Sequence, residues 1–155
     1  MFDLDERLRA DTHAVGDLQL SLVLLNRDAN YPWIILVPRR EAMTEVYQLN
    51  AADRALLLQE SCTLAEVMVA LYQPEKINIA TLGNQVPQLH MHHLARYKTD
   101  AAWPGPVWGK VPAINHSADA LSRRLDVLRA ALAEHGLVAN ELVPGTTRAR
   151  KTSSA

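Results

Sequence analysis

Three of the six histidines of this chain lie within four consecutive positions, in the segment that runs from Gln88 to Leu94. Side chains alternate between the two faces of a strand, so a strand here would place Gln88, His90 and His92 on one face and His93 on the other. Burying two neighbouring imidazoles costs free energy unless their nitrogens bind a polar partner or take part in chemistry. They could hold a phosphate, coordinate a metal ion, or act as nucleophile and acid.

A metal site would need further ligands, because Zn²⁺ is held by three or four protein side chains. The remaining histidines, His13, His116 and His135, are scattered along the chain. The single cysteine, Cys62, falls within an apolar helical pattern, where a buried structural thiol is expected. We therefore expect no metal ion and no cofactor, although a pair of histidines alone leaves the metal alternative open.

The residues that lead into this segment favour an anionic ligand. Gly83 permits a tight turn, and the amides of Asn78, Asn84 and Gln85 offer neutral donors and acceptors close to the histidines. Neutral amides and imidazoles that converge on a turn suit a phosphate. A Gly-Asn pair is also typical of an ordinary hairpin turn, so the turn alone does not decide between the two interpretations.

The segment Gln88-Leu-His-Met-His-His-Leu94 resembles the motif of the histidine-triad (HIT) superfamily, His-x-His-x-His followed by two apolar residues. Upstream, Leu25-Asn-Arg27 and the run from Trp33 to Arg40 are similar to the family's ribose-binding hairpin. The resemblance covers roughly residues 18 to 96. The segment from Trp103 to Gly109 resembles a bacterial branch with a Gln-x-His-x-His variant of the triad.

The resemblance implies a nucleotide hydrolase or transferase. It would act at the α-phosphate of a nucleoside phosphoramidate or dinucleoside polyphosphate, through a nucleotidyl-histidine intermediate. His90 would be the nucleophile, and His92 would help to hold the phosphate or the leaving group. Gln88 would support the site, and the nucleotide-binding residues would be Asn26 at the ribose and Asn78, Asn84 and Gln85 at the phosphate side.

Three positions depart from the family pattern. Gln88 replaces the first histidine, which could preserve catalysis or mark a non-catalytic nucleotide-binding module; both alternatives stay open. His93 replaces a usual apolar residue and is expected on the opposite face. Trp33 stands where the family often has histidine, and we interpret it as packing or as a wall facing the base.

The elements that must position these residues follow from periodicity and turn formers. The sequence predicts an α+β fold of the HIT type, in which an antiparallel sheet of about five strands carries a long helix and an added C-terminal helix. One domain is expected over residues 1–140, followed by a disordered tail over 141–155. The predicted helices are 3–12, a long one from Asn50 to Gln73, and one capped by Ser117 that ends near Gly136; the strands are 18–25, 33–37, 76–81 and 88–96, and residues 97–116 are irregular.

Composition excludes several classes of function. The chain has 155 residues, 48% of them hydrophobic, and a net charge of −1. It therefore lacks the excess of positive charge that is typical of nucleic-acid-binding proteins. We identify no run of about 20 apolar residues and no signal peptide at the N-terminus, so no membrane partner is expected. A cytoplasmic location, a small-molecule nucleotide substrate and, by resemblance, a homodimer are the resulting expectations.

Overall fold

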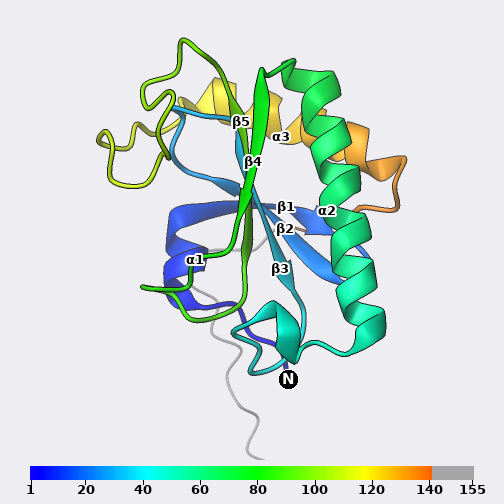
Figure 1. Ribbon diagram of the computed structural model, residues 1–155. Helices are drawn as coiled ribbons and strands as arrows, with labels where there is room; N and C mark the ends of the chain where they lie inside the picture. The colour runs from blue at the N-terminus through cyan, green and yellow to red at the C-terminus, as the bar shows by residue number, and fades with distance from the viewer. Residues whose placement is uncertain (141–155) are drawn as a thin grey trace, which may run out of the picture.

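A computed structural model describes residues 1–140 as a six-stranded antiparallel sheet with three helices (Figure 1). The strand order is β4-β5-β3-β2-β1-β6. This arrangement confirms the predicted α+β class, with one strand more than the expected five. The strands are β1 (Thr12–Asp17), β2 (Ser21–Asn26), β3 (Trp33–Pro38), β4 (Lys76–Ala80), β5 (Met91–Arg96) and β6 (Val138–Ala139).

The two faces of the sheet are covered differently. Helices α2 (Ala51–Tyr72) and α3 (Ala118–Ala133) pack on one face, whereas α1 (Glu6–Asp11) and the irregular segment 97–116 lie on the other (Figure 1). A short 3-10 helix, Val46–Gln48, precedes α2. Alternation along β3 supplies both cores, since Ile34 and Leu36 join the first and Trp33, Ile35 and Val37 join the second.

Helix α2 begins and ends where its flanking residues predict. The side-chain oxygen of Asn50 accepts a hydrogen bond of 2.8 Å from the backbone N–H of Asp53, which is the bond expected of an N-cap. Gln73 ends the helix in a left-handed conformation with φ of 47°, and Pro74 cannot continue it. Ser117 likewise caps α3, whose Leu128 and Leu132 are buried.

Strand β1 was not predicted, and the predicted helix over residues 3–12 was too long. Helix α1 ends at Asp11, and Thr12 already has extended geometry as the first residue of β1. The sequence of β1 alternates poorly, with a register shift between Ala14 and Gly16. A Cβ atom at Gly16 would lie 2.5 Å from the carbonyl oxygen of Val138, so glycine is what lets β6 approach this closely.

One further expectation was wrong. Cys62 is exposed on α2 rather than buried, because the apolar residues of α2 that face the core are Leu57, Leu64, Val67 and Met68. Helix α2 is long and apolar enough to cross a membrane by length and composition alone. Charged residues interrupt it, so it is not a continuous apolar run, and its four core residues pack as those of a core helix do. The predicted tail, 141–155, lies outside the described residues.

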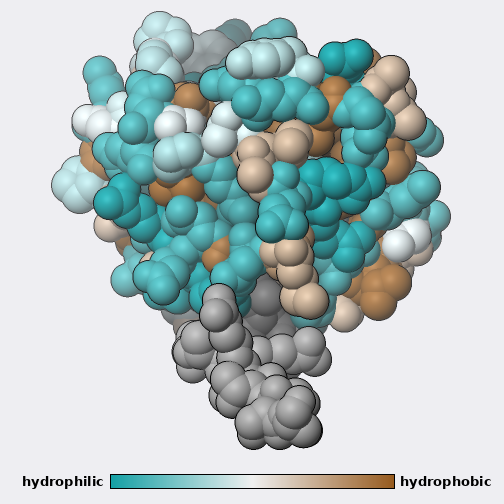
Figure 2. Space-filling view, turned by 90° about the horizontal axis from the view of Figure 1, so that it is seen from below, coloured by the Kyte–Doolittle hydropathy of each residue, from teal (hydrophilic) through white to brown (hydrophobic). Residues whose placement is uncertain are grey.

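The molecular surface seen from below is mainly hydrophilic (Figure 2). Hydrophobic residues appear on this face as separate patches rather than as one continuous area. Dispersed apolar side chains of this kind are ordinary for a folded domain.

Candidate functional site

A pocket of about 420 Å³ opens on the face of the sheet that carries α1. It lies between the end of α1, strands β3 and β5, the turn that follows β4, and the irregular segment 97–116. His90 and His92 both line it. The other lining residues are Leu8, Asp11, Thr12, Asn26, Trp33, Ile35, Leu82, Gly83, Asn84, Gln85, Val86, Trp108 and Gly109.

His90 is held by a backbone carbonyl immediately before β5. Its Nδ1 lies 2.6 Å from the carbonyl oxygen of Gln88. A carbonyl oxygen only accepts hydrogen bonds, so His90 Nδ1 carries a proton, and in the neutral ring Nε2 keeps a lone pair. The residue as a whole is 7% exposed. His90 therefore presents an unprotonated nitrogen from a fixed, largely buried ring, as a nucleophile requires.

His92 has the opposite arrangement of protons. The indole N–H of Trp33 donates to His92 Nδ1 over 2.9 Å, so the single proton of neutral His92 lies on Nε2. Burial, followed by the charges of His90 and His93, lowers the pKa of His92 to about 3. The two rings are 4.8 Å apart at their centroids. The pair thus combines a lone pair on His90 with an N–H donor on His92.

Two tryptophans enclose His92. Trp33 and Trp108 meet edge to face with ring centroids 5.8 Å apart, and the centroid of Trp108 lies 5.3 Å from that of His92. Packing or a base-facing wall was expected of Trp33. Trp33 is buried in the second core and lines the pocket, but its hydrogen bond to His92 is a contact that neither interpretation anticipated.

The structure brings five of the seven predicted site residues together and places two elsewhere. Asn26, Asn84, Gln85, His90 and His92 line the pocket. Asn78 and Gln88 are absent from this lining. Asn78 lies on β4, and its side-chain oxygen accepts a hydrogen bond of 2.7 Å from Arg96.

Gln88 does not share a strand face with the histidines, because β5 begins only at Met91. Its amide instead holds the N-terminal segment. Oε1 accepts from the backbone N–H of Asp5 over 2.9 Å, and Nε2 donates to the carbonyl oxygen of Asp3 over 2.8 Å. The side chain of Gln88 therefore acts on the N-terminal segment, whereas its backbone carbonyl orients His90.

His93 faces away from the pocket, as its place in the strand predicts. Its Nε2 lies 2.7 Å from the hydroxyl of Ser61 on α2, and its Nδ1 lies 3.1 Å from the carbonyl oxygen of Met91. Burial lowers the pKa of His93 to about 4. This histidine joins the sheet to α2 on the far side of the sheet.

Sequence reasoning missed the pocket residues that α1 and the irregular segment contribute. Leu8, Asp11 and Thr12 reach the site because α1 packs beside β1 and the N-terminal segment is tied to the turn after β4. Arg7 makes one such tie, donating to the carbonyl oxygen of Gln85 over 2.9 Å. No local pattern marks these residues as functional. Apart from the two histidines, Asp11 is the only lining residue with an ionisable side chain.

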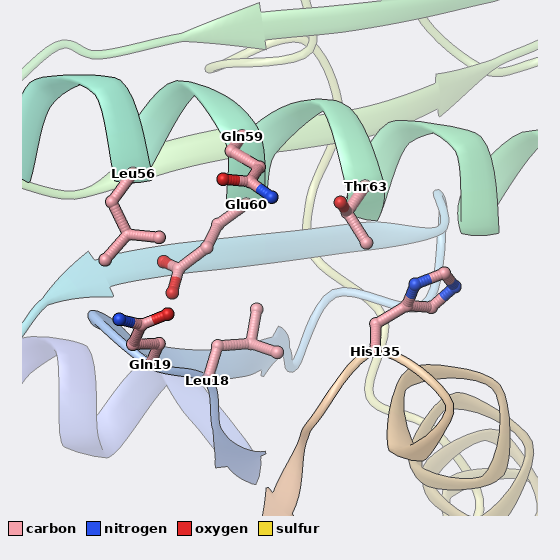
Figure 3. A pocket seen from close by; sticks show the side chains of 7 residues that line it. All are labelled: Leu18, Gln19, Leu56, Gln59, Glu60, Thr63 and His135. Atoms are coloured by element: carbon pink, nitrogen blue, oxygen red, sulfur yellow. The ribbon is translucent and has the colours of Figure 1, made fainter.

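A second, smaller pocket of about 90 Å³ lies between α2, the turn that joins β1 to β2, and the loop after α3 (Figure 3). Glu60 extends from α2 towards Gln19, and His135 lies at the other end of the pocket (Figure 3). This pocket lacks the paired histidines. Within residues 1–140, no group of three or more histidine, cysteine, aspartate or glutamate side chains is placed to hold a metal ion.

Comparisons with known proteins identify relatives of this chain. The model of a family described as HIT domain matches residues 7–99. A histidine triad protein from Marinobacter aquaeolei VT8 is 46% identical, with a TM-score of 0.84 over 86% of this chain and 98% of that one. A histidine triad protein from Bradyrhizobium japonicum is 43% identical, with a TM-score of 0.82 over 84% and 97%.

A more distant likeness is to the diadenosine triphosphate hydrolase of Plasmodium falciparum. It is 15% identical, with a TM-score of 0.58 over 86% of this chain and 82% of that one, so the likeness is one of fold. No significant match was found among curated proteins.

Proposed function

This chain belongs to the HIT domain family, and we propose that it is a nucleotide hydrolase or transferase that acts at the α-phosphate of its substrate through His90. Family membership and the name of the distant Plasmodium falciparum hydrolase support this class of activity. The substrate is a nucleoside monophosphate joined to a leaving group, such as a dinucleoside polyphosphate or a nucleoside phosphoramidate.

One observation carries the proposal, namely the hydrogen bond between His90 Nδ1 and the carbonyl oxygen of Gln88. It fixes the tautomer of His90, so that the lone pair lies on Nε2 of a ring that lines a pocket large enough for a small ligand. A phosphoryl centre beside that nitrogen would meet a neutral imidazole, which is a competent nucleophile near neutral pH.

The reaction follows from these proton positions. His90 Nε2 forms a bond to the α-phosphorus, and the bond from phosphorus to the leaving group breaks, with its electron pair leaving on the departing atom. The adduct carries a positive imidazolium ring, which the carbonyl oxygen of Gln88 stabilises at Nδ1–H. Water then attacks phosphorus, the P–N bond returns its electrons to His90, and the water proton passes to solvent.

The rest of the lining supplies hydrogen-bonding groups for the nucleotide, and all of these groups except Asp11 are uncharged. The turn that carries Gly83, Asn84 and Gln85 lies along one side of the pocket, and we assign it to the phosphate. Asn26 and Asp11 lie within the same lining, and we assign them to the ribose hydroxyls. Phosphoryl transfer depends mainly on such positioning and on charge stabilisation.

The test is release of AMP by chromatography from a panel of adenosine phosphoramidates and dinucleoside polyphosphates. Wild-type protein should turn over at least one of them, and His90→Ala should abolish turnover while nucleotide binding, measured by calorimetry, survives. His135→Ala is the matched control, because His135 is an exposed histidine in the other pocket. Intact-protein mass spectrometry after rapid quenching should show a nucleotidyl adduct that His90→Ala lacks.

The alternative of a non-catalytic nucleotide-binding module makes a different prediction. Wild-type protein would then bind AMP with an affinity that depends on Asn84 and Gln85, yet it would release no product from any member of the panel. Turnover that persists in His90→Ala would also overturn the proposed role of His90.

A further inference from the structure

The hydrogen bond from Trp33 restricts what His92 can do. An indole N–H only donates, so the 2.9 Å bond requires a lone pair on His92 Nδ1. An imidazolium ion has no lone pair on either nitrogen. Protonation of His92 would therefore break this bond and set two N–H groups against each other in a place where both residues are more than nine-tenths buried.

The surroundings of His92 provide no carboxylate partner for an imidazolium ion. His90 and His93 repel a positive charge on His92 whenever they are charged themselves, and Trp108 meets the ring of His92 in a T-shaped arrangement. Burial and these two charges all lower the pKa of His92, and no carboxylate is among the groups that shift it. Asp11 lines the pocket from the end of α1 without contributing to that shift.

We propose that Trp33 is a positioning residue that confines the site to nucleotides whose leaving group departs as a stable oxyanion, such as phosphoanhydrides and acyl phosphates, in preference to amines. The proposal rests on the function proposed above and specifies its substrate class.

The difference between the two kinds of leaving group lies in the proton. When His90 Nε2 bonds to phosphorus, the departing atom takes the electron pair of the broken bond. A phosphate or carboxylate oxygen keeps that pair as a stable anion, and His92 Nε2–H can stabilise it with a hydrogen bond. An amine nitrogen must receive a proton in order to leave. Neutral His92 could supply that proton only by becoming an imidazolate anion, so it donates a hydrogen bond but no proton.

The experiment measures how the rate depends on the leaving group. Aryl esters of AMP, with phenols of graded pKa, provide oxyanion leaving groups, and an adenosine 5′-phosphoramidate provides a P–N bond. For the wild-type protein, log kcat/KM should fall steeply as the pKa of the phenol rises. The phosphoramidate should react at least about a hundredfold more slowly than the best ester, since general-acid assistance is typically of that size or larger. A flat dependence, or a phosphoramidate as fast as that ester, would overturn the proposal.

Two substitutions of Trp33 distinguish the loss of its hydrogen-bond donor from the gain of an acceptor beside His92. Trp33→His provides a nitrogen that can accept a hydrogen bond, so His92 can hold a second proton. In this variant the slope of log kcat/KM against the pKa of the phenol should become shallower. The rate with the phosphoramidate relative to the best ester should rise about tenfold or more. Trp33→Phe removes the donor without adding an acceptor, so rates should fall for all leaving groups by similar factors while the slope stays steep. An unchanged slope in Trp33→His would contradict the proposal.

The wild-type slope tests the inference even if a Trp33 variant fails to fold. The role of Trp33 and the proposed function are overturned by different results. Loss of turnover in His90→Ala together with a flat leaving-group dependence would overturn only the role of Trp33. Wild-type protein that turns over none of these substrates would overturn the proposed function itself, and the inference with it.

Discussion

The side-chain oxygen of Asn78 accepts a hydrogen bond of 2.7 Å from Nη1 of Arg96, a residue that is only 2% exposed. Arg96 also pairs with Asp100 and donates to the carbonyl oxygen of Gly105. Asn78 is thus part of a buried polar network that holds the irregular segment 97–116 against the sheet. Its position indicates a structural contribution, where the resemblance implied a phosphate contact.

Substitution of Asn78 should therefore affect stability more than catalysis. Asn78→Ala leaves one buried guanidinium N–H without its partner, and the free energy of unfolding should fall by about 1–3 kcal/mol. The matched variant is Asn84→Ala, which removes an exposed amide that lines the pocket. It should raise KM with little change in stability. Urea unfolding and steady-state kinetics on both variants distinguish the two roles, and the reverse pattern would restore Asn78 to the phosphate site.

Gln88→Ala should loosen the N-terminal segment. The variant loses both hydrogen bonds to the backbone of Asp3 and Asp5 but keeps the carbonyl that orients His90. Hydrogen exchange at the first residues of the chain should accelerate, and kcat should fall by less than about tenfold, because no side chain that contacts the substrate is removed. A loss of activity as complete as that of His90→Ala would instead place the Gln88 side chain in the reaction.

Stability should decrease as the solution is acidified below the ordinary histidine pKa. His92 and His93 have pKa values of about 3 and about 4 in the folded protein, against 6.5 for a free side chain. Between these values the unfolded chain binds more protons, so lowering the pH favours unfolding. Each ring should lower the free energy of unfolding by up to about 1.4 kcal/mol per pH unit.

Urea unfolding at a series of pH values from about 7 to 4.5 measures this dependence. His135→Gln is the control, since His135 is exposed and its removal should leave the slope unchanged. A free energy of unfolding that does not change over this range would show that the two buried rings titrate normally.

Glu60 should stabilise the turn between β1 and β2. Its Oε1 accepts a hydrogen bond of 2.7 Å from the backbone N–H of Leu20, while Oε2 is buried without a partner among residues 1–140. Glu60→Ala leaves that buried N–H unpaired and should cost about 1–3 kcal/mol. Glu60→Gln keeps an acceptor and should cost less. Equal losses of stability in the two variants, measured by urea unfolding, would mean that the hydrogen bond to Leu20 does not matter.

The homodimer stays a prediction, and the surface of α2 offers a way to test it. Leu58 and Val69 are 65% and 49% exposed, and Cys62 lies on the same helical stripe. Ile79 is exposed on β4, the edge strand beyond which the sheet has no partner among the described residues. Light scattering should show a dimer for the wild-type protein and a monomer for Leu58→Glu combined with Val69→Glu. Arg123→Glu, at an exposed position on α3 away from this stripe, serves as the control.

Local patterns were sufficient wherever a structure depends on neighbours in the sequence. Asn50 and Ser117 mark the starts of their helices because an N-cap needs only its own next three residues. The hairpin of β2 and β3 followed from two apolar runs and a short polar connection. The alternation of side chains along β5 placed His92 and His93 on opposite faces, and the motif around them indicated the family.

The tertiary structure alone decided which chemistry each histidine can perform. The sequence shows two similar imidazoles, yet a carbonyl two residues away puts the proton of His90 on Nδ1, and an indole 59 positions away puts that of His92 on Nε2. Strand β1 and the pocket residues of α1 were also beyond local reasoning, because they depend on packing against distant segments. A proton position is set by whichever partner lies within hydrogen-bonding distance, and that distance exists only in the folded chain.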